Sequence, residues 1–171
     1  MASDVRIVLT GFMGVGKSSV GRHVAQMLGE PRADLDTVIE SSENRSIAQI
    51  VDAETEAGFR KIETRHLRAT IADDTLKILS LGGGAWTIPE NRQMLRNANF
   101  TSIWLEATFE HCWLNITFSR RDRPLARHKE RALELFEARQ KIYCLADWHF
   151  IIRPGFTSYE VAKQIVDEVF G

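Results

Sequence analysis

The sequence predicts one α/β domain, built from a parallel sheet with helices on both faces. Short apolar runs alternate with longer segments of helical period, which is the pattern of strands joined by crossover helices. The chain has 171 residues, a length typical of a single domain. Hydrophobic residues make up 44% of the chain and charged residues 26%, so a core can form without a disulfide framework or a structural metal.

The first half of the chain supplies two strands and two helical segments. Residues 5–9 are an apolar run typical of a buried strand, and apolar residues of helical spacing follow until Gly29 ends that helix. A short run at residues 33–35 indicates a second strand. Ser46 is suited to cap a helix that opens at the next residue, and residues 54–72 continue with helical spacing and many charges.

The second half repeats this alternation and brings the number of expected strands to five. The third strand runs directly into three consecutive glycines. The expected strands are residues 77–81, 100–105 and 150–152, and the expected helices are residues 91–96, 109–118, 131–145 and 159–170.

Composition excludes several classes of protein. The two cysteines, Cys112 and Cys144, form no CxxC pair, which argues against a disulfide framework or a cysteine-rich zinc site. A formal net charge of −1 argues against nucleic acid as a partner. No apolar run reaches the roughly 18 residues that cross a bilayer, and residues 1–4 do not open a signal peptide. We therefore expect a cytoplasmic protein without a membrane partner.

A phosphate-binding loop follows the first strand. Residues 11–18 read GFMGVGKS and match GxxxxGK[ST] between a strand and a helix, where this motif cradles a nucleoside triphosphate. Lys17 is expected to reach the β- and γ-phosphates, and the Ser18 hydroxyl to bind Mg²⁺. The alternative, a plain glycine-rich turn, does not account for Lys17 and Ser18. The other expected nucleotide contacts are Gly14, Val15, Gly16 and Ser19.

Two carboxylates follow the second strand. Asp34 and Asp36 are two residues apart, so in an extended segment they point the same way, and ligands of open α/β sheets bind at this end of the strands. One carboxylate is suited to the Mg²⁺ shell, and the other to accept a proton from a substrate hydroxyl. The alternative is that Asp36 only caps a helix over residues 37–42. Beside a phosphate loop, the functional interpretation is favoured.

Two further features have competing interpretations. Arg60 and Glu63 are three residues apart on a helix, and spacing alone favours a solvated ion pair over an arginine held ready for a carboxylate ligand. Gly82, Gly83 and Gly84 lie at the end of the third strand. Three glycines exceed what a turn needs, so contact between this backbone and a ligand is favoured.

A basic stretch covers residues 120–131. Its cations are Arg120, Arg121, Arg123, Arg127, Lys129 and Arg131. A mobile segment of this kind can fold over a triphosphate and neutralise charge during phosphoryl transfer. The alternatives are a solvated charge run and an RNA-binding patch, although the stretch contains no aromatic side chains on which bases would stack. Arg139, on the next helix, is expected at the surface, and Arg153 ends the fifth strand.

Taken together, the motifs resemble those of the shikimate kinase family. The resemblance covers about residues 5–167 and preserves order and spacing. It rests on the phosphate loop, Asp34-Leu35-Asp36, Phe59-Arg60-x-x-Glu63, the LSLGGGA run at residues 79–85, and Arg123-Pro124-Leu125.

The resemblance implies a fold and an activity. The fold is the three-layer P-loop kinase fold of nucleoside monophosphate kinases, with a five-stranded parallel sheet of order 2-3-1-4-5. One domain would cover residues 1–171, with a mobile lid at about 120–130 and substrate-binding helices at about 37–72. The activity is transfer of the ATP γ-phosphate to the 3-hydroxyl of shikimate, which gives shikimate 3-phosphate and ADP in aromatic amino acid biosynthesis. The family also implies Mg²⁺ and a monomer.

The resemblance also implies roles for single residues. Asp36 would bind substrate hydroxyls and act as the base, while Asp34 and Ser18 would serve the Mg²⁺ shell. Arg60 and Arg139 would bind the substrate carboxylate, with residues 82–84 beside the ring. Lys17 and Arg123 would approach the phosphates, and Arg153 would lie by the adenine.

The sequence departs from the family pattern in the lid region and beside the glycines, and two other functions are possible. Residues 123–143 are a few residues shorter than in bacterial members of the family, so the lid is expected to close less fully. One residue is missing between Tyr143 and Ala146, and Trp86 is a bulky neighbour of the glycines that could narrow the acceptor pocket. The alternatives are a kinase for quinate or gluconate and a regulatory homologue that binds ATP without catalysis.

Overall fold

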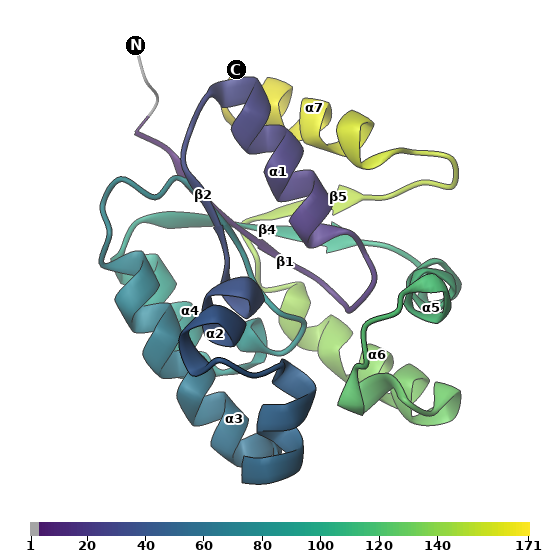
Figure 1. Cartoon of the computed structure of the whole chain (residues 1–171). Helices are drawn as coiled ribbons and strands as arrows, with labels where there is room; N and C mark the ends of the chain where they lie inside the picture. The colour runs from purple at the N-terminus through teal and green to yellow at the C-terminus, as the bar shows by residue number, and fades with distance from the viewer. Residues whose placement is uncertain (1–3) are drawn as a thin grey trace.

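The central strand of the sheet is β1 (Arg6–Thr10), which is buried along its whole length. The computed structural model describes residues 4–171, so residues 1–3, which enter the signal-peptide prediction, lie outside the described part. The five strands are all parallel, in the order β2-β3-β1-β4-β5 (Figure 1), which confirms the implied topology. The other strands are β2 (Arg32–Asp34), β3 (Ile78–Ser80), β4 (Phe100–Glu106) and β5 (Trp148–Ile151).

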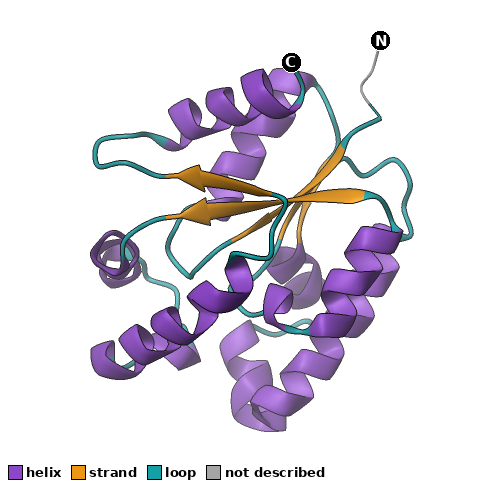
Figure 2. Cartoon of the chain, turned by 180° about the vertical axis from the view of Figure 1, so that it is seen from behind, coloured by secondary structure: helices purple, strands orange, loops and turns teal. Residues whose placement is uncertain are grey.

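Helices cover both faces of the sheet. On one face, α1 (Lys17–Leu28) packs against α7 (Ser158–Val169). The other face carries α3 (Ile47–Ile71), α4 (Pro89–Asn97) and α6 (Lys129–Tyr143) (Figures 1 and 2). The three layers confirm the predicted α/β architecture. The remaining elements are α2 (Leu35–Glu43), α5 (Phe109–Phe118) and the 3₁₀ helices η1 (Ala85–Thr87) and η2 (Pro124–Ala126).

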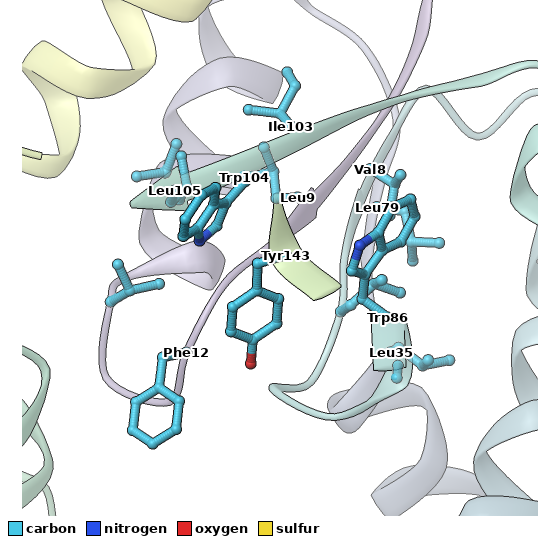
Figure 3. Close-up of a cluster of buried hydrophobic side chains, with 14 of the residues drawn as sticks. Val8, Leu9, Phe12, Leu35, Leu79, Trp86, Ile103, Trp104, Leu105 and Tyr143 are labelled. Carbon is cyan, nitrogen blue, oxygen red and sulfur yellow. The ribbon is translucent and has the colours of Figure 1, made fainter. Parts of the chain in front are cut away.

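The core lies between the sheet and these helices. Val8, Leu9 and Leu79 are fully buried on neighbouring strands, as expected for parallel strands that are covered on both faces. Figure 3 shows them with Trp86 and Trp104 in one apolar cluster. Because the strands are paired and packed into this core, their carboxyl ends have fixed positions relative to one another.

Arg6 joins the amino-terminal end of β1 to the ends of two helices. It is 8% exposed, and its guanidinium donates to four carbonyl oxygens at 2.9–3.2 Å. These carbonyls belong to Ile71, Asp73, Leu76 and Ala98. The same guanidinium lies 4.1 Å from the centre of the Phe100 ring. This buried cation therefore satisfies carbonyls at the carboxyl ends of α3 and α4, where helices leave such groups unpaired.

Helix caps explain two element boundaries. Ser46 and Gln49 form a reciprocal capping box at the start of α3, as predicted for Ser46. Thr55 has a positive φ of 69° and interrupts this helix, which is why its helical spacing is regular only beyond that point. Asp34, and not Asp36, caps α2, because the Asp34 carboxylate accepts from the Thr37 amide. The alternative capping role of Asp36 is therefore wrong.

The other strand and helix boundaries differ from the prediction by at most two residues, and the helix over residues 109–118 has the predicted bounds. β5 begins at Trp148, two residues before the predicted start. The prediction missed these residues because this edge strand is largely exposed, so its first residues do not form an apolar run. The two 3₁₀ helices were not predicted, since three residues are too few for a helical period. No helix among residues 4–171 is long and apolar enough to cross a membrane.

Candidate active site

The carboxyl ends of the strands surround a cavity of about 530 Å³. Loops that follow β1, β2, β3 and β5 line it, as expected for ligand binding in an open parallel sheet. The phosphate-loop residues Gly14, Val15, Gly16, Lys17, Ser18 and Ser19 all line this cavity. The structure thus brings together the six residues predicted from the motif to contact a nucleotide.

Glycines and a helix end form the phosphate-binding part of this cavity. Gly16 precedes α1 with a φ of 104°, a conformation that side chains rarely adopt. Gly14 has a φ of 78°, and a Cβ there would lie 2.6 Å from the Cys112 carbonyl oxygen. No side chain caps the start of α1, so the N–H groups of its first turn face the cavity without a side-chain acceptor. This geometry is suited to phosphate oxygens.

Lys17 is buried at the base of the loop. Its Nζ donates to the carbonyl oxygens of Gly11 at 2.7 Å and Phe12 at 3.0 Å. Burial lowers the pKa of Lys17 to about 8, although the negative charge of Asp36 opposes this shift. A buried ammonium group with only carbonyl partners is well placed to gain an anionic ligand.

Ser18 and Asp34, the two residues predicted to bind Mg²⁺, contact each other in the structure. The Ser18 hydroxyl donates to Asp34 Oδ2, while Asp34 Oδ1 accepts from the Thr37 amide at 3.3 Å. Asp34 therefore has two roles, since it caps α2 and also faces the phosphate loop. These hard oxygen atoms fit Mg²⁺, which is typically bound by one or two protein groups together with phosphates and waters. Within residues 4–171, no cluster of three or more His, Cys, Asp or Glu residues provides another candidate metal site.

A second, smaller cavity of about 80 Å³ lies beside the glycine run. It is bounded by α3, by η2 with the basic segment before it, and by α6. Arg60, Glu63, Arg139 and all three glycines line it. The residues that the resemblance assigned to the acceptor are therefore neighbours in the structure.

The Arg60–Glu63 pair is not the solvated ion pair that spacing alone favours. Arg60 Nη1 lies 2.8 Å from Glu63 Oε1, and Glu63 is completely buried. Burial raises the pKa of Glu63, although the Arg60 charge opposes this effect. The second carboxylate oxygen, Oε2, has no hydrogen-bond partner in the described structure. Glu63 therefore fixes the Arg60 guanidinium through Nη1, while Nη2 lies 3.6 Å from Oε1 of Glu56, an exposed carboxylate.

Each of the three glycines lies against one of the side chains that are predicted to bind the acceptor. A Cβ on Gly82 would lie 2.7 Å from Asp36 Oδ1, and a Cβ on Gly83 would lie 3.3 Å from Arg139 Nη1. A Cβ on Gly84 would overlap the Arg60 guanidinium. None of the three has a positive φ, so they are required for close approach and not for an unusual backbone conformation.

Arg139 and Arg123 are two further cations that line these cavities. Arg139 is only 5% exposed, which corrects the expectation that it lies at the surface. Arg123 is partly buried, and its Nη1 has no hydrogen-bond partner. Neither arginine has a carboxylate within ion-pair distance in the described part of the chain. Burial lowers the pKa of Arg123 below its usual value, as expected for a cation without a counter-ion.

The two cavities meet at a shared set of residues. Six side chains or backbone segments line both cavities: Met13, Asp36, Gly82, Gly83, Arg121 and Arg123. Asp36 and Arg123 were predicted here. Arg121 was not, because nothing in the sequence distinguishes it from the other cations of the basic stretch. Its position beside Asp36 follows only from the path of the segment between α5 and α6.

Arg153 and Trp86 lie elsewhere. Arg153 lines an open hollow over β5 and α7 that shares Phe156 with the cavity of the phosphate loop, and its contact with a base remains a prediction. Trp86 is buried in the core and donates from Nε1 to the Ile142 carbonyl oxygen at 3.0 Å. It does not line the smaller cavity, so the structure gives no sign that it narrows the acceptor pocket.

Asn115 is a further neighbour of the phosphate loop that the sequence did not indicate. Its Nδ2 donates to the Gly14 carbonyl oxygen at 2.8 Å, and it lines the larger cavity together with His111. A lone asparagine in a helical pattern carries no signal for such a contact. The bond connects α5 with the phosphate loop.

The fold and this site define an ATP-dependent P-loop kinase that acts on a small molecule. Comparison with known proteins identifies the family. The shikimate kinase family model matches residues 13–170. The chain belongs to the shikimate kinase family.

Individual relatives agree with this assignment. The chain is 40% identical over 164 residues to a shikimate kinase of Caulobacter vibrioides, which covers 94% of this chain and 79% of the relative. It is 40% identical over 166 residues to a shikimate kinase of Ruegeria pomeroyi, with 95% and 82% covered. A solved shikimate kinase from Acinetobacter baumannii in complex with shikimate superposes with a TM-score of 0.89 at 30% identity, over 97% of this chain and 93% of that one.

Proposed function

We propose that this protein transfers the γ-phosphate of ATP to the 3-hydroxyl of shikimate, giving shikimate 3-phosphate and ADP for aromatic amino acid biosynthesis. The observation that carries the proposal is that Asp36 and Arg123 line both cavities. The phosphate loop lines the larger cavity next to the residues that the two cavities share. A nucleotide bound by this loop would therefore direct its terminal phosphate at the place where the two cavities meet. An acceptor in the smaller cavity would meet it there.

The acceptor cavity has the chemistry that shikimate requires. Shikimate carries one carboxylate and three hydroxyl groups. Arg60, held by Glu63, and Arg139, which has no carboxylate partner in the described part of the chain, are suited to the carboxylate, since guanidinium groups bind carboxylates through two parallel hydrogen bonds. Asp36 and the backbone of Gly82–Gly84 are suited to the hydroxyls.

Asp36 is the proposed base. Burial raises its pKa, and the positive charges of Arg121 and Lys17 oppose that shift. A carboxylate in this position can hold the acceptor hydroxyl in line with the phosphate and accept its proton as the new bond forms. Its location between the cavities is what this role requires.

Charge neutralisation falls to the cations around the phosphates. Lys17 would contact the β- and γ-phosphates, and Arg123 would approach the transferred group from the lid segment. Ser18 and Asp34 would hold Mg²⁺, which, when bound, offsets negative charge on the β- and γ-phosphates. Arg60 is held by Glu63 and Lys17 is buried in the phosphate loop, so positioning supplies much of the expected rate enhancement.

We also propose a monomer that works in the cytoplasm, where ATP is available, with ATP and shikimate as its partners and no nucleic acid or membrane partner. Residues of this one chain line both cavities, which supports the monomer. Light scattering of the purified protein tests this point. A dimer whose disruption abolishes activity would contradict it.

A coupled assay of ADP release tests the reaction. We expect shikimate to support turnover far better than quinate or gluconate. Asp36→Asn should abolish turnover while calorimetry still detects ATP binding, because the substitution keeps the shape and removes the proton acceptor. Turnover with another acid and none with shikimate would overturn the substrate assignment. ATP binding without any turnover would favour a regulatory homologue.

A further inference from the structure

The last turn of α6 is joined to the glycine run by two hydrogen bonds. The Tyr143 hydroxyl donates to the Gly83 carbonyl oxygen at 2.5 Å, and Trp86 Nε1 donates to the Ile142 carbonyl oxygen at 3.0 Å. The donors come from opposite sides, since Tyr143 belongs to α6 and Trp86 to η1, directly after the glycines. The two contacts fix the glycine run and the end of α6 relative to each other.

Tyr143 lies deep in the protein. It is completely buried, and its ring centre lies 6.1 Å from that of Trp104. Figure 3 shows the hydroxyl on the side of the ring away from Trp104. Burial raises the pKa of Tyr143 to about 12, so the hydroxyl keeps its proton at all relevant pH values and remains a donor. The hydroxyl can therefore donate to Gly83 at neutral pH.

The same helix carries a proposed substrate-binding arginine. Arg139 lies one turn before Tyr143 on α6, and its Nη1 would be 3.3 Å from a Cβ on Gly83. Gly83 is thus held by Tyr143 through its carbonyl group and is packed against Arg139 at its Cα. The distance between Arg139 and the glycine backbone depends on how α6 is joined to that run.

We propose that Tyr143 is a positioning residue for the acceptor: its hydroxyl sets the separation between the Arg139 guanidinium and the glycine backbone. This inference rests on the proposed binding of shikimate in the smaller cavity and goes beyond it, since Tyr143 does not line that cavity. The phenyl ring alone would fill the core equally well. The hydroxyl is the part of the side chain that reaches the glycine run.

Removing the hydroxyl alone tests the proposal. In Tyr143→Phe, we expect the KM for shikimate to rise about five- to twenty-fold, which corresponds to the loss of one buried hydrogen bond. The KM for ATP should stay within about twofold, because the phosphate loop does not contact α6 through this bond. Tyr159→Phe is the matched control, since Tyr159 is the other tyrosine of the chain and is exposed. It should leave both KM values unchanged.

If Tyr143 served only the stability of the fold, the KM measurements would give a different result. If Tyr143→Phe lowers the melting temperature but leaves the KM for shikimate at the wild-type value, or raises both KM values equally, the proposal is overturned. Trp86→Phe supplies a second variant that removes the other hydrogen bond. It should also raise the KM for shikimate selectively, and the double variant should show less than the product of the two effects, because both bonds fix the same separation.

The wild-type enzyme separates this inference from the proposed function. Activity of the wild type on shikimate together with an unchanged KM in Tyr143→Phe would overturn the role of Tyr143 alone. Absence of wild-type activity on shikimate would overturn the substrate assignment, and the positioning role with it.

Discussion

Arg121 Nη2 lies 3.5 Å from Asp36 Oδ2, so a cation of the segment between α5 and α6 faces the proposed base. The same nitrogen lies 3.3 Å from Glu40 Oε1 on α2. Among the charges around Asp36, that of Arg121 is the strongest in lowering its pKa, against the raising effect of burial. Arg121 therefore partly offsets the effect of burial on the pKa of Asp36.

Arg121→Ala should shift the acid side of the pH profile of kcat/KM to higher pH. Loss of the cation raises the pKa of Asp36 further, and the base is active only when deprotonated, so activity is lost at a higher pH as the pH falls. Initial rates measured between pH 5 and pH 9 with shikimate and ATP show this shift.

Arg127→Ala is the control for this experiment. Arg127 belongs to the same basic segment, but it pairs with Asp122 and Asp52 and not with Asp36. Its removal should leave the acid side of the profile in place. An unchanged profile in Arg121→Ala would show that the pair with Asp36 has no effect on the base.

Lys17 makes nucleotide binding sensitive to pH. Its pKa is about 8 in the ligand-free protein, and the negative charge of the phosphates should raise that value in the complex. ATP binding near pH 8 should therefore take up protons, and ATP affinity should weaken as the pH rises above 8, where Lys17 is neutral before binding. Calorimetric titrations in two buffers of different ionisation enthalpy measure the number of protons exchanged.

Lys17→Met provides the control for proton uptake. Residual ATP binding by this variant should proceed without the Lys17 contribution, so uptake near pH 8 should fall. Equal proton uptake by wild type and Lys17→Met would contradict the assignment of the titration to Lys17.

Arg6 gives a prediction about stability rather than activity. Arg6→Met should lower the free energy of unfolding by about 3–5 kcal/mol, since it leaves carbonyl oxygens of α3, α4 and the adjoining loop without their charged donor. Urea denaturation measures this loss. The KM for shikimate should not change, because Arg6 lies at the amino-terminal end of β1, opposite the site. A selective rise in that KM would contradict the separation of the two regions.

The sequence predicts the phosphate loop well because its function depends on local backbone geometry. Gly16 and Lys17 are adjacent in the chain and in the site, so a short motif describes them fully. Strand order was predicted by resemblance, since no local pattern determines which strands become neighbours. The structure places β3 between β1 and β2, which brings the glycine run beside Asp36.

Long-range burial could not be predicted in the same way. Arg139 and Glu63 have the spacing of ordinary surface residues on charged helices, and only the packing of α3 and α6 around the glycine run buries them. Arg121 and Tyr143 depend likewise on contacts across more than fifty residues of chain. Helical periodicity describes one helix at a time and contains no information on such contacts.

Arg60 is the residue through which the acceptor site can be tested most directly. Arg60→Ala should weaken shikimate binding by about 2–4 kcal/mol, a roughly 30- to 900-fold loss, because it removes a carboxylate ligand and leaves Glu63 buried without its partner. Calorimetry with shikimate measures the loss, while ATP binding should be preserved. Arg68→Ala is the control, since Arg68 lies on the same helix and forms an exposed pair with Glu90.

Gly84→Ala should reproduce the effect of Arg60→Ala without removing any charge. A Cβ at this position would overlap the Arg60 guanidinium, which Glu63 holds at 2.8 Å, so the arginine would have to leave its place beside the glycine run. We expect a raised KM for shikimate and an unchanged KM for ATP, measured by the coupled assay. Wild-type affinity for shikimate in Gly84→Ala would mean that Arg60 does not bind the acceptor from the position that the structure gives it.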